Sequence, residues 1–280
     1  MGRRNYADWR ISRIPVEKVA CPDDLEADAG ENRIFLEDTM DRVQYTFKRY
    51  EKKFVLTLKQ YEALVSLLGN YMKEDEYGVH TIGNIYYDTD DYDLVRTSIE
   101  KPPYKEKFRL RSYGIPDDNS SIFAEIKKKF DGVVYKRRVA ATPLEMQDFL
   151  NGGQIPHEDI QIQREIYWFL HMFHLTPKVF IGYERIAFEG YENPDLRITF
   201  DRNIRWRLEE LDFRCGTEGQ PVLPEERIVM EIKLPQTFPL WLAAVLSELQ
   251  IYSTGFSKYG ACYQRHIATN LFTERKKFVC

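Results

Sequence analysis

Charged residues recur at every second position in several short segments of the chain. Side chains two residues apart on a β-strand lie on the same face, so each segment would present its charges together. Arginine offers paired donors to phosphate oxygens, lysine acts as a point charge, and carboxylates bind divalent cations. The pattern therefore predicts a site for a polyanion and a metal ion. The segments are residues 49–53, 107–111, 125–129, 136–138, 197–201 and 231–233.

A solvated sheet is the ordinary explanation for any one of these strands. An antiparallel sheet commonly packs one face on a core and leaves the other to water, which gives the same alternation. Here arginine and lysine dominate the polar face, and the pattern recurs in nearly every predicted strand. About eight such strands can close into a barrel with room for a narrow ligand. A polyanion inside that barrel would relieve the repulsion among its cations, so we favour the barrel.

Hydrophobic periodicity predicts the elements that position these charges. Strands are predicted over residues 45–56, 80–88, 105–113, 121–129, 133–140, 178–188, 196–201 and 227–234. Helices are predicted over residues 57–68, 142–153, 157–173, 239–249 and 254–271. Thr57, followed three residues later by Gln60, has the pattern of a capping box. The expected fold class is α+β: an antiparallel β-barrel of about eight strands forming a basic tunnel, with helices packed outside.

The bulk composition limits the function classes. The 280 residues include 40 Lys and Arg against 44 Asp and Glu, a formal net charge of −4 that argues against a general nucleic-acid binder. No apolar run approaches the roughly 18 residues needed for a membrane span. The four cysteines form no CxxC pair and indicate reduced thiols in a cytoplasmic protein. We expect a variable N-terminal arm over residues 1–42 and one domain over residues 43–280.

The motifs, taken in chain order, resemble those of a known family. They are Arg49-x-Glu51-x-Lys53, Tyr87-Asp88-Thr89, Arg109-x-Arg111-Ser112-Tyr113, Glu125-x-Lys127-Lys128-Lys129, Tyr183-x-Arg185-x-Ala187-Phe188, Arg197-x-Thr199-x-Asp201, Glu231-x-Lys233 and Ser257-Lys258-Tyr259. The series resembles the catalytic domain of vacuolar transporter chaperone proteins, within the triphosphate tunnel metalloenzyme superfamily. The resemblance runs from about Tyr45 to Ile267. Each motif is short, and their specificity comes from eight of them in one order.

The resemblance implies a polyphosphate polymerase. Such a phosphotransferase moves the terminal phosphoryl group of ATP to a growing inorganic polyphosphate chain with Mn2+ or Mg2+, so its partners are ATP and polyphosphate. The implied catalytic residues are Arg109, Arg111, Lys127, Arg185, Arg197 and Lys258. The implied phosphate-binding residues are Arg49, Lys53, Lys129, Lys136, Arg138 and Lys233. The implied metal ligands are Glu231, Glu51 and Glu125.

One departure from the superfamily pattern bears on the reaction. The usual opening strand carries Glu-x-Glu-x-Lys, whereas Arg49 stands at the first position here. This replacement removes an acid from the metal site and adds a phosphate ligand, which favours the polymerase branch. Two alternatives remain open: a triphosphatase or polyphosphatase of the same fold, with Glu51 or Glu125 activating water, and a non-catalytic polyphosphate-binding subunit. Eukaryotic relatives carry a regulatory domain and membrane helices that channel the product, so we expect product translocation here either to require a partner or not to occur.

Overall fold

The structure is a computed structural model, and it describes residues 50–131, 133–224, 226–234 and 237–269. The predicted arm of residues 1–42 and the predicted phosphate ligand Arg49 lie outside this range. The strands are β1 (Tyr50–Thr57), β2 (Met72–Glu74), β3 (His80–Asp88), β4 (Tyr104–Tyr113), β5 (Ile122–Phe130), β6 (Val133–Ala141), β7 (Thr176–Gly190), β8 (Arg197–Arg207), β9 (Gln220–Pro221) and β10 (Arg227–Leu234). The α-helices are α1 (Leu58–Leu68), α2 (Asp93–Glu100), α3 (Pro143–Leu150), α4 (Ile160–Met172), α5 (Leu240–Glu248) and α6 (Lys258–Cys262).

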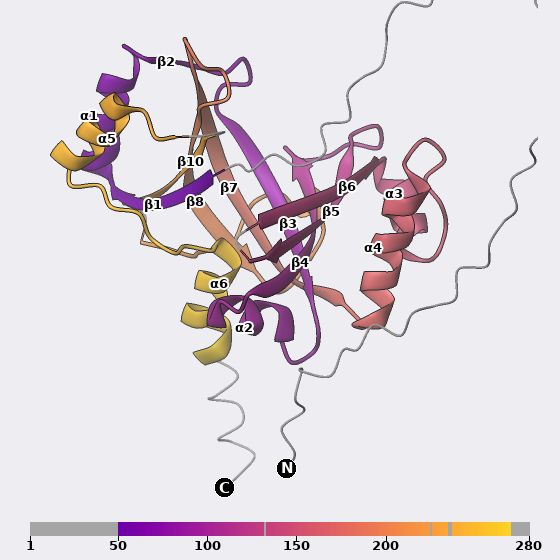
Figure 1. The fold of residues 1–280 in the computed structure, drawn as a ribbon. Helices are drawn as coiled ribbons and strands as arrows, with labels where there is room; N and C mark the ends of the chain where they lie inside the picture. The colour runs from indigo at the N-terminus through magenta and orange to yellow at the C-terminus, as the bar shows by residue number, and fades with distance from the viewer. Residues whose placement is uncertain (1–49, 132, 225, 235–236, 270–280) are drawn as a thin grey trace, which may run out of the picture. The chain divides into compact units, whose positions relative to one another are not determined.

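The eight longer strands form one antiparallel sheet in the order β1-β10-β8-β7-β3-β4-β5-β6. The short strands β2 and β9 pair with β7 and β8. The sheet curls into a half-barrel whose edge strands are β1 and β6 (Figure 1). No backbone pairing joins these two strands within the described residues. The prediction of about eight antiparallel strands forming a barrel-like sheet is confirmed, and the sheet is open along one side.

Two hydrophobic cores cover the outer face of the sheet. One lies under α1 and α5, where Leu64 and Leu242 pack with Ile232 of β10. The other lies under α3 and α4, where Phe149 and Phe169 pack against the sheet. Burying one such side chain contributes ~2 kcal/mol, so these contacts fix which strand face turns outward. The residues that alternate with the apolar ones must therefore face inward.

A third core covers part of the inner face. Tyr86 of β3 and Tyr183 of β7 pack there with Val95 of α2 and Tyr259 of α6. Helices α2 and α6 therefore close one end of the half-barrel, whereas the sequence predicts every helix outside it. The two tyrosines explain the difference, because they make the inner face apolar at this end and give the helices a surface to pack on.

Most predicted elements lie within one or two residues of the observed ones. The capping box of α1 is present: Thr57 Oγ1 accepts a hydrogen bond from the Gln60 backbone nitrogen at 3.2 Å, and Gln60 Oε1 accepts one from the Thr57 backbone at 3.0 Å. The predicted helix from residue 254 begins only at Lys258, because the Ser257 hydroxyl accepts from the Gly260 backbone nitrogen at 3.2 Å and caps the helix there. Strands β2 and β9 are too short for their periodicity to show.

Candidate functional site

The register of the sheet places the alternating charges on one continuous inner surface, which we call the charged face. Directly paired residues of neighbouring antiparallel strands point to the same side. Glu51 pairs with Lys233, and Lys53 pairs with Glu231, for example. The members of the charged face, in strand order from β1 to β6, are Glu51, Lys53, Lys233, Glu231, Arg197, Asp201, Arg185, Arg111, Arg109, Lys107, Lys105, Glu125, Lys127, Lys129, Arg138 and Lys136.

Two predicted metal ligands, Glu51 and Glu231, lie on either side of Lys53. Lys53 Nζ is 3.1 Å from Glu51 Oε1 and 3.7 Å from Glu231 Oε2. Lys233 Nζ is 3.4 Å from Glu231 Oε1. Burial opposes the charge on Glu231, but the surrounding lysines outweigh it and hold the pKa of this carboxyl well below its usual range. One or two carboxylates, completed by substrate phosphates, are a normal environment for Mg2+, so these residues fit the expected ion.

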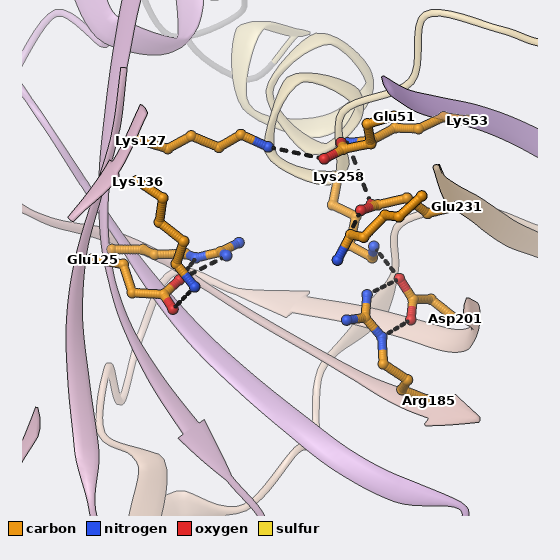
Figure 2. Close-up of polar contacts among 11 residues, drawn as sticks. Glu51, Lys53, Glu125, Lys127, Lys136, Arg185, Asp201, Glu231 and Lys258 are labelled. Atoms are coloured by element: carbon orange, nitrogen blue, oxygen red, sulfur yellow. Dashed lines mark hydrogen bonds and ion pairs between the residues drawn. The ribbon is translucent and has the colours of Figure 1, made fainter. Parts of the chain in front are cut away.

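The third predicted metal ligand, Glu125, lies on the opposite side of the charged face (Figure 2). Its carboxylate is 2.8 Å from Arg109 Nη2, 2.5 Å from Lys136 Nζ and 3.9 Å from Arg111 Nε. Burial raises the pKa of Glu125, but these three cations outweigh that effect and lower the pKa to about 2. No group of three or more His, Cys, Asp or Glu side chains suited to a metal exists in the described part of the chain. In the structure, Glu125 holds Arg109, Arg111 and Lys136 together through these three contacts.

The two arginines of β4 are held in fixed orientations. Arg111 is buried, and its Nε donates to Asn84 Oδ1 at 3.1 Å. Asn84 in turn donates through Nδ2 to the Ile181 carbonyl at 3.0 Å. Arg109 donates to the Tyr86 hydroxyl at 3.2 Å as well as to Glu125. Both guanidinium groups are thus preorganised for an anion, which reduces the conformational entropy lost on binding.

Asp201 of β8 is fully buried and joins two predicted catalytic cations (Figure 2). Arg185 forms a bidentate pair with it, with Nε at 2.6 Å from Oδ1 and Nη2 at 2.8 Å from Oδ2. Lys258, the first residue of α6, donates to the same Oδ2. Its Nζ also lies 4.4 Å from the centroid of the Tyr183 ring. Asp201 therefore holds a cation from the sheet and one from α6 in a single cluster.

The buried Tyr183 reports the electrostatic character of this region. Burial alone raises the pKa of its hydroxyl, but Arg185, Arg111 and Lys258 lower it to about 8. A phenol with an ordinary pKa near 10 ionises this readily only in a positive environment. The same environment favours a bound polyanion.

Helix α6 contacts both sides of the charged face through adjacent residues. The Ser257 hydroxyl accepts a hydrogen bond from Lys107 Nζ at 2.9 Å, whereas Lys258 binds Asp201 on the other side. The helix is anchored by Tyr259, whose hydroxyl donates to the buried Asp88 at 2.9 Å. These contacts place α6 between β4 and β8, at the end of the half-barrel that α2 and α6 close.

A further ion pair spans the two sides. Lys127 Nζ of β5 lies 3.4 Å from Glu51 Oε2 of β1, although these strands stand near opposite ends of the sheet order. Figure 2 shows this contact crossing the interior. The interior of the half-barrel is thus narrow enough at this point for a lysine of β5 to contact a glutamate of β1.

The remaining predicted residues lie toward the margins of the charged face. Arg197 is 46% exposed and its Nη2 pairs with Asp75 Oδ2 at 3.1 Å. The Arg138 guanidinium lies 5.0 Å from the centroid of the Phe123 ring. Lys129 faces Lys105 across the β4–β5 pair. The structure therefore gathers all the predicted site residues within the described range onto one surface, with Glu125 apart from the other two predicted metal ligands.

Four residues with a clear place in the site received no individual role in the sequence-based prediction. Lys107 and Asp201 fall within the predicted charged segments 107–111 and 197–201, where their alternation with Arg109 and Arg197 was a sufficient signal. Tyr183 belongs to one of the motifs that carry the resemblance, but no role was assigned to it. Asn84 had no comparable signal, because a buried amide in a strand otherwise resembles a core residue.

In the part of the chain that the structure describes, no helix combines the length and hydrophobicity required to cross a bilayer.

Among solved structures, the chain resembles an adenylate cyclase candidate from Bacillus halodurans, with a TM-score of 0.46 and 15% identity over 74% of this chain and 92% of that one. It also resembles HpAC1 from Hippeastrum, an adenylyl cyclase candidate with a dominant triphosphatase activity. The TM-score is 0.46, with 16% identity over 76% of this chain and 94% of that one.

The sequence comparisons are more specific. The chain is 27% identical over 237 residues to vacuolar transporter chaperone complex subunit 4 of Schizosaccharomyces pombe. That alignment covers 69% of this chain and 32% of the relative, so the chain spans about a third of the relative's length. The family model of the VTC domain matches residues 48–267, which include all the charged strands. The chain therefore belongs to the VTC domain family.

Proposed function

We propose that this protein is a polyphosphate polymerase that transfers the terminal phosphoryl group of ATP to the end of an inorganic polyphosphate chain. The observation that carries the proposal is the charged face, where two adjacent carboxylates, Glu51 and Glu231, stand opposite the cations of β4 and β5. Membership of the VTC domain family supports it. We further propose that residues 43–280 form the catalytic domain, acting in the cytoplasm, and that residues 1–42 form a separate arm.

The cations of the charged face would bind and orient the terminal phosphate of ATP and the terminal phosphate of the polyphosphate chain. Phosphoryl transfer depends on positioning and charge neutralisation more than on covalent assistance. Arg109, Arg111 and Arg185 offer fixed donors because each is already hydrogen-bonded on one side. Lys258 would approach from α6 and bind the phosphate at the reacting end. Lys53 and Lys127 would exchange their carboxylate contacts for phosphate oxygens.

Glu231, with Glu51 beside it, would hold a divalent ion, Mn2+ or Mg2+. When bound, such an ion neutralises charge on the transferring phosphoryl group. The neighbouring lysines lower the pKa of both carboxyl groups against the effect of burial, and these same lysines would bind phosphate. The residues that would hold the ion and those that would hold the substrate are therefore contiguous.

The protonation state of the acids favours transfer to phosphate over hydrolysis. A hydrolase needs a proton acceptor for water, and an effective one has a pKa near the working pH. The pKa of Glu125 lies at about 2, where its burial is outweighed by Arg109, Arg111 and Lys136. Burial also opposes ionisation of Glu51, and Lys127 and Lys53 nonetheless lower its pKa. A terminal phosphate is already ionised near neutral pH and needs no base.

The test is an incubation of the purified protein with ATP and Mn2+, with ADP, free phosphate and long-chain polyphosphate quantified separately. We expect ADP and polyphosphate to accumulate together with little free phosphate. Free phosphate as the main product, above all from added tripolyphosphate, would identify a hydrolase instead. Tight polyphosphate binding with neither product would identify a binding subunit.

A further inference from the structure

Thr199 of β8 is an uncharged residue on the inner surface of the half-barrel, between Arg197 and Asp201 of the charged face. It pairs directly with Glu231 of β10, which in turn pairs with Lys53 of β1. Directly paired residues of antiparallel strands point to the same side, with Cβ atoms about 5 Å apart. The Thr199 hydroxyl is therefore a near neighbour of the Glu231 carboxylate.

This hydroxyl is buried and unpaired. Thr199 is 6% exposed, and its Oγ1 forms no hydrogen bond with any described residue. The neighbouring Asp201 carboxylate binds Arg185 and Lys258 instead. On the other side of β8, Thr199 pairs with Ala187, whose side chain has no polar atom. Buried polar groups normally have a partner, so an unpaired hydroxyl on this surface indicates a ligand that binds there.

Packing does not explain a threonine at this position. A branched side chain suits a β-strand, but valine has the same shape and no hydroxyl to desolvate. Ile198 and Phe200, on either side of Thr199, face outward into the hydrophobic core under α1 and α5. The hydroxyl is therefore placed for a ligand in the interior and adds nothing to that core.

A hydroxyl beside a carboxylate is a recurring environment for a divalent ion. In P-loop nucleotide-hydrolysing proteins, a serine or threonine hydroxyl and an aspartate hold Mg2+ together with phosphate oxygens. The Glu231 carboxylate repels a phosphate oxygen and attracts a cation, so the register favours a metal ion as the partner of the Thr199 hydroxyl. A neutral oxygen also completes the ligand set without the like-charge repulsion that another acid would bring.

We propose that Thr199 is a further ligand of the divalent ion, contributing Oγ1 beside the Glu231 carboxylate. The proposal rests on the proposed function, because it completes the site that this function assigns to Mn2+ or Mg2+. Phosphate oxygens and water would fill the remaining positions, as is usual for Mg2+.

The test measures metal binding without turnover. Mn2+ is titrated into each purified protein with one equivalent of tripolyphosphate, and free Mn2+ is followed by electron paramagnetic resonance. Binding that Glu231→Gln removes is assigned to the site. We expect Thr199→Val to raise the dissociation constant of that site by about tenfold or more, the effect typical of losing a group that supports a metal. Thr199→Ser keeps the hydroxyl and should bind Mn2+ like wild type.

Unfolding experiments separate a metal ligand from a structural residue. In EDTA, Thr199→Val should unfold at the same urea concentration as wild type or a higher one, because it removes an unpaired buried hydroxyl and keeps the side-chain shape. Mn2+ should raise the unfolding midpoint of wild type more than that of the variant, since an ion bound to the folded state stabilises it. The control is Thr81→Val, the same change on the outward-facing side of β3, which should respond to Mn2+ like wild type.

Wild-type affinity for Mn2+ in Thr199→Val would overturn the proposal, as would the absence of a site that depends on Glu231. Normal Mn2+ binding with weakened polyphosphate binding would assign the hydroxyl to a phosphate and also overturn it. The proposed function is judged separately, from product formation. If Thr199→Val weakens Mn2+ binding but the wild type forms no ADP from ATP, the metal ligand stands and the polymerase does not.

Discussion

The two sides of the charged face balance their cations differently. On what we call the carboxylate side, formed by β1, β10 and β8 with Arg185 of β7, the acids Glu51, Glu231 and Asp201 pair with the neighbouring cations. On the lysine side, formed by β4, β5 and β6, Glu125 is the acid of the charged face, and it serves Arg109, Arg111 and Lys136. The carboxylate side is therefore nearly compensated without ligand, and the lysine side is not.

In the proposed enzyme, this difference would separate two tasks within one sheet. On the carboxylate side, carboxylates balance most of the cations, so the side chains are held in place and the carboxylates can bind a metal ion. On the lysine side, several cations have no acid beside them within the described residues, so a bound polyanion would supply the missing negative charge. Substitutions on the carboxylate side should therefore mainly change stability and turnover. Substitutions on the lysine side should mainly change the affinity for polyphosphate and the pH dependence of that affinity.

The largest effect is expected for Asp201→Asn on the carboxylate side. Arg185 and Lys258 would lose their shared carboxylate while remaining largely buried, and breaking a buried pair in this way costs about 3–5 kcal/mol. Urea unfolding followed by circular dichroism measures the loss. Asp90→Asn, which removes the highly exposed partner of Lys178, is the control and should leave the unfolding midpoint unchanged. A similar midpoint for both variants would show that the Asp201 cluster is solvated.

The next effect concerns turnover. Glu231→Gln should reduce the rate of polyphosphate formation by at least about a hundredfold, because metal-ion catalysis supplies several kcal/mol of transition-state stabilisation. Chelation of divalent ions in the wild type should have the same effect. Polyphosphate binding, measured by titration, should persist because the lysine side is intact. Unchanged turnover in the variant would rule out Glu231 as a metal ligand.

A pH dependence of affinity should belong to the lysine side. The pKa of Lys107 is about 7 in the free protein, and a bound polyanion raises it. Binding therefore takes up a proton between the two values, and affinity for long-chain polyphosphate should fall as pH rises from about 6.5 to about 8.5, by up to tenfold per unit. Titrations in two buffers with different ionisation enthalpies measure the proton uptake.

The groups around Lys107 determine this behaviour. Lys53 of β1, Lys127 of β5, and Lys105 and Arg109 of its own strand all oppose its charge, and Ser257 beside α6 is neutral. Lys107→Arg should bind with a flatter pH profile, because arginine stays protonated throughout the range. A wild type and a variant with the same slope would assign the pH dependence to the ligand or to another group.

The smallest effect is expected where the two sides meet. The Lys127–Glu51 pair is partly exposed, so a double-mutant cycle with Lys127→Met and Glu51→Gln should give a coupling free energy below about 1 kcal/mol in unfolding experiments. Each single variant should nevertheless weaken turnover, since both residues belong to the site. A coupling well above this value would mean that the pair holds the half-barrel together.

The sequence was most informative where alternation alone decides the structure. It predicted β3 and β10 with their observed bounds and assigned Lys53, Arg109 and Glu231 to one face, because a period of two determines which face a residue occupies. It could not show that Glu125 lies apart from Glu51, since that depends on the order of strands in the sheet. Nor could it show that α6 covers the inner face, because that placement depends on distant tyrosines of β3 and β7.

The position of α6 couples the two sides mechanically. Ser257 contacts Lys107 on the lysine side and Lys258 contacts Asp201 on the carboxylate side, so two adjacent residues fix the distance between the two sides. The hydrogen bond from Tyr259 to Asp88 holds this segment against β3. In the proposed polymerase, a displacement of this short helix would change both the contacts to the polyphosphate chain and the position of Lys258. Substitutions in α6 should therefore alter affinity and turnover together, unlike substitutions confined to one side of the charged face.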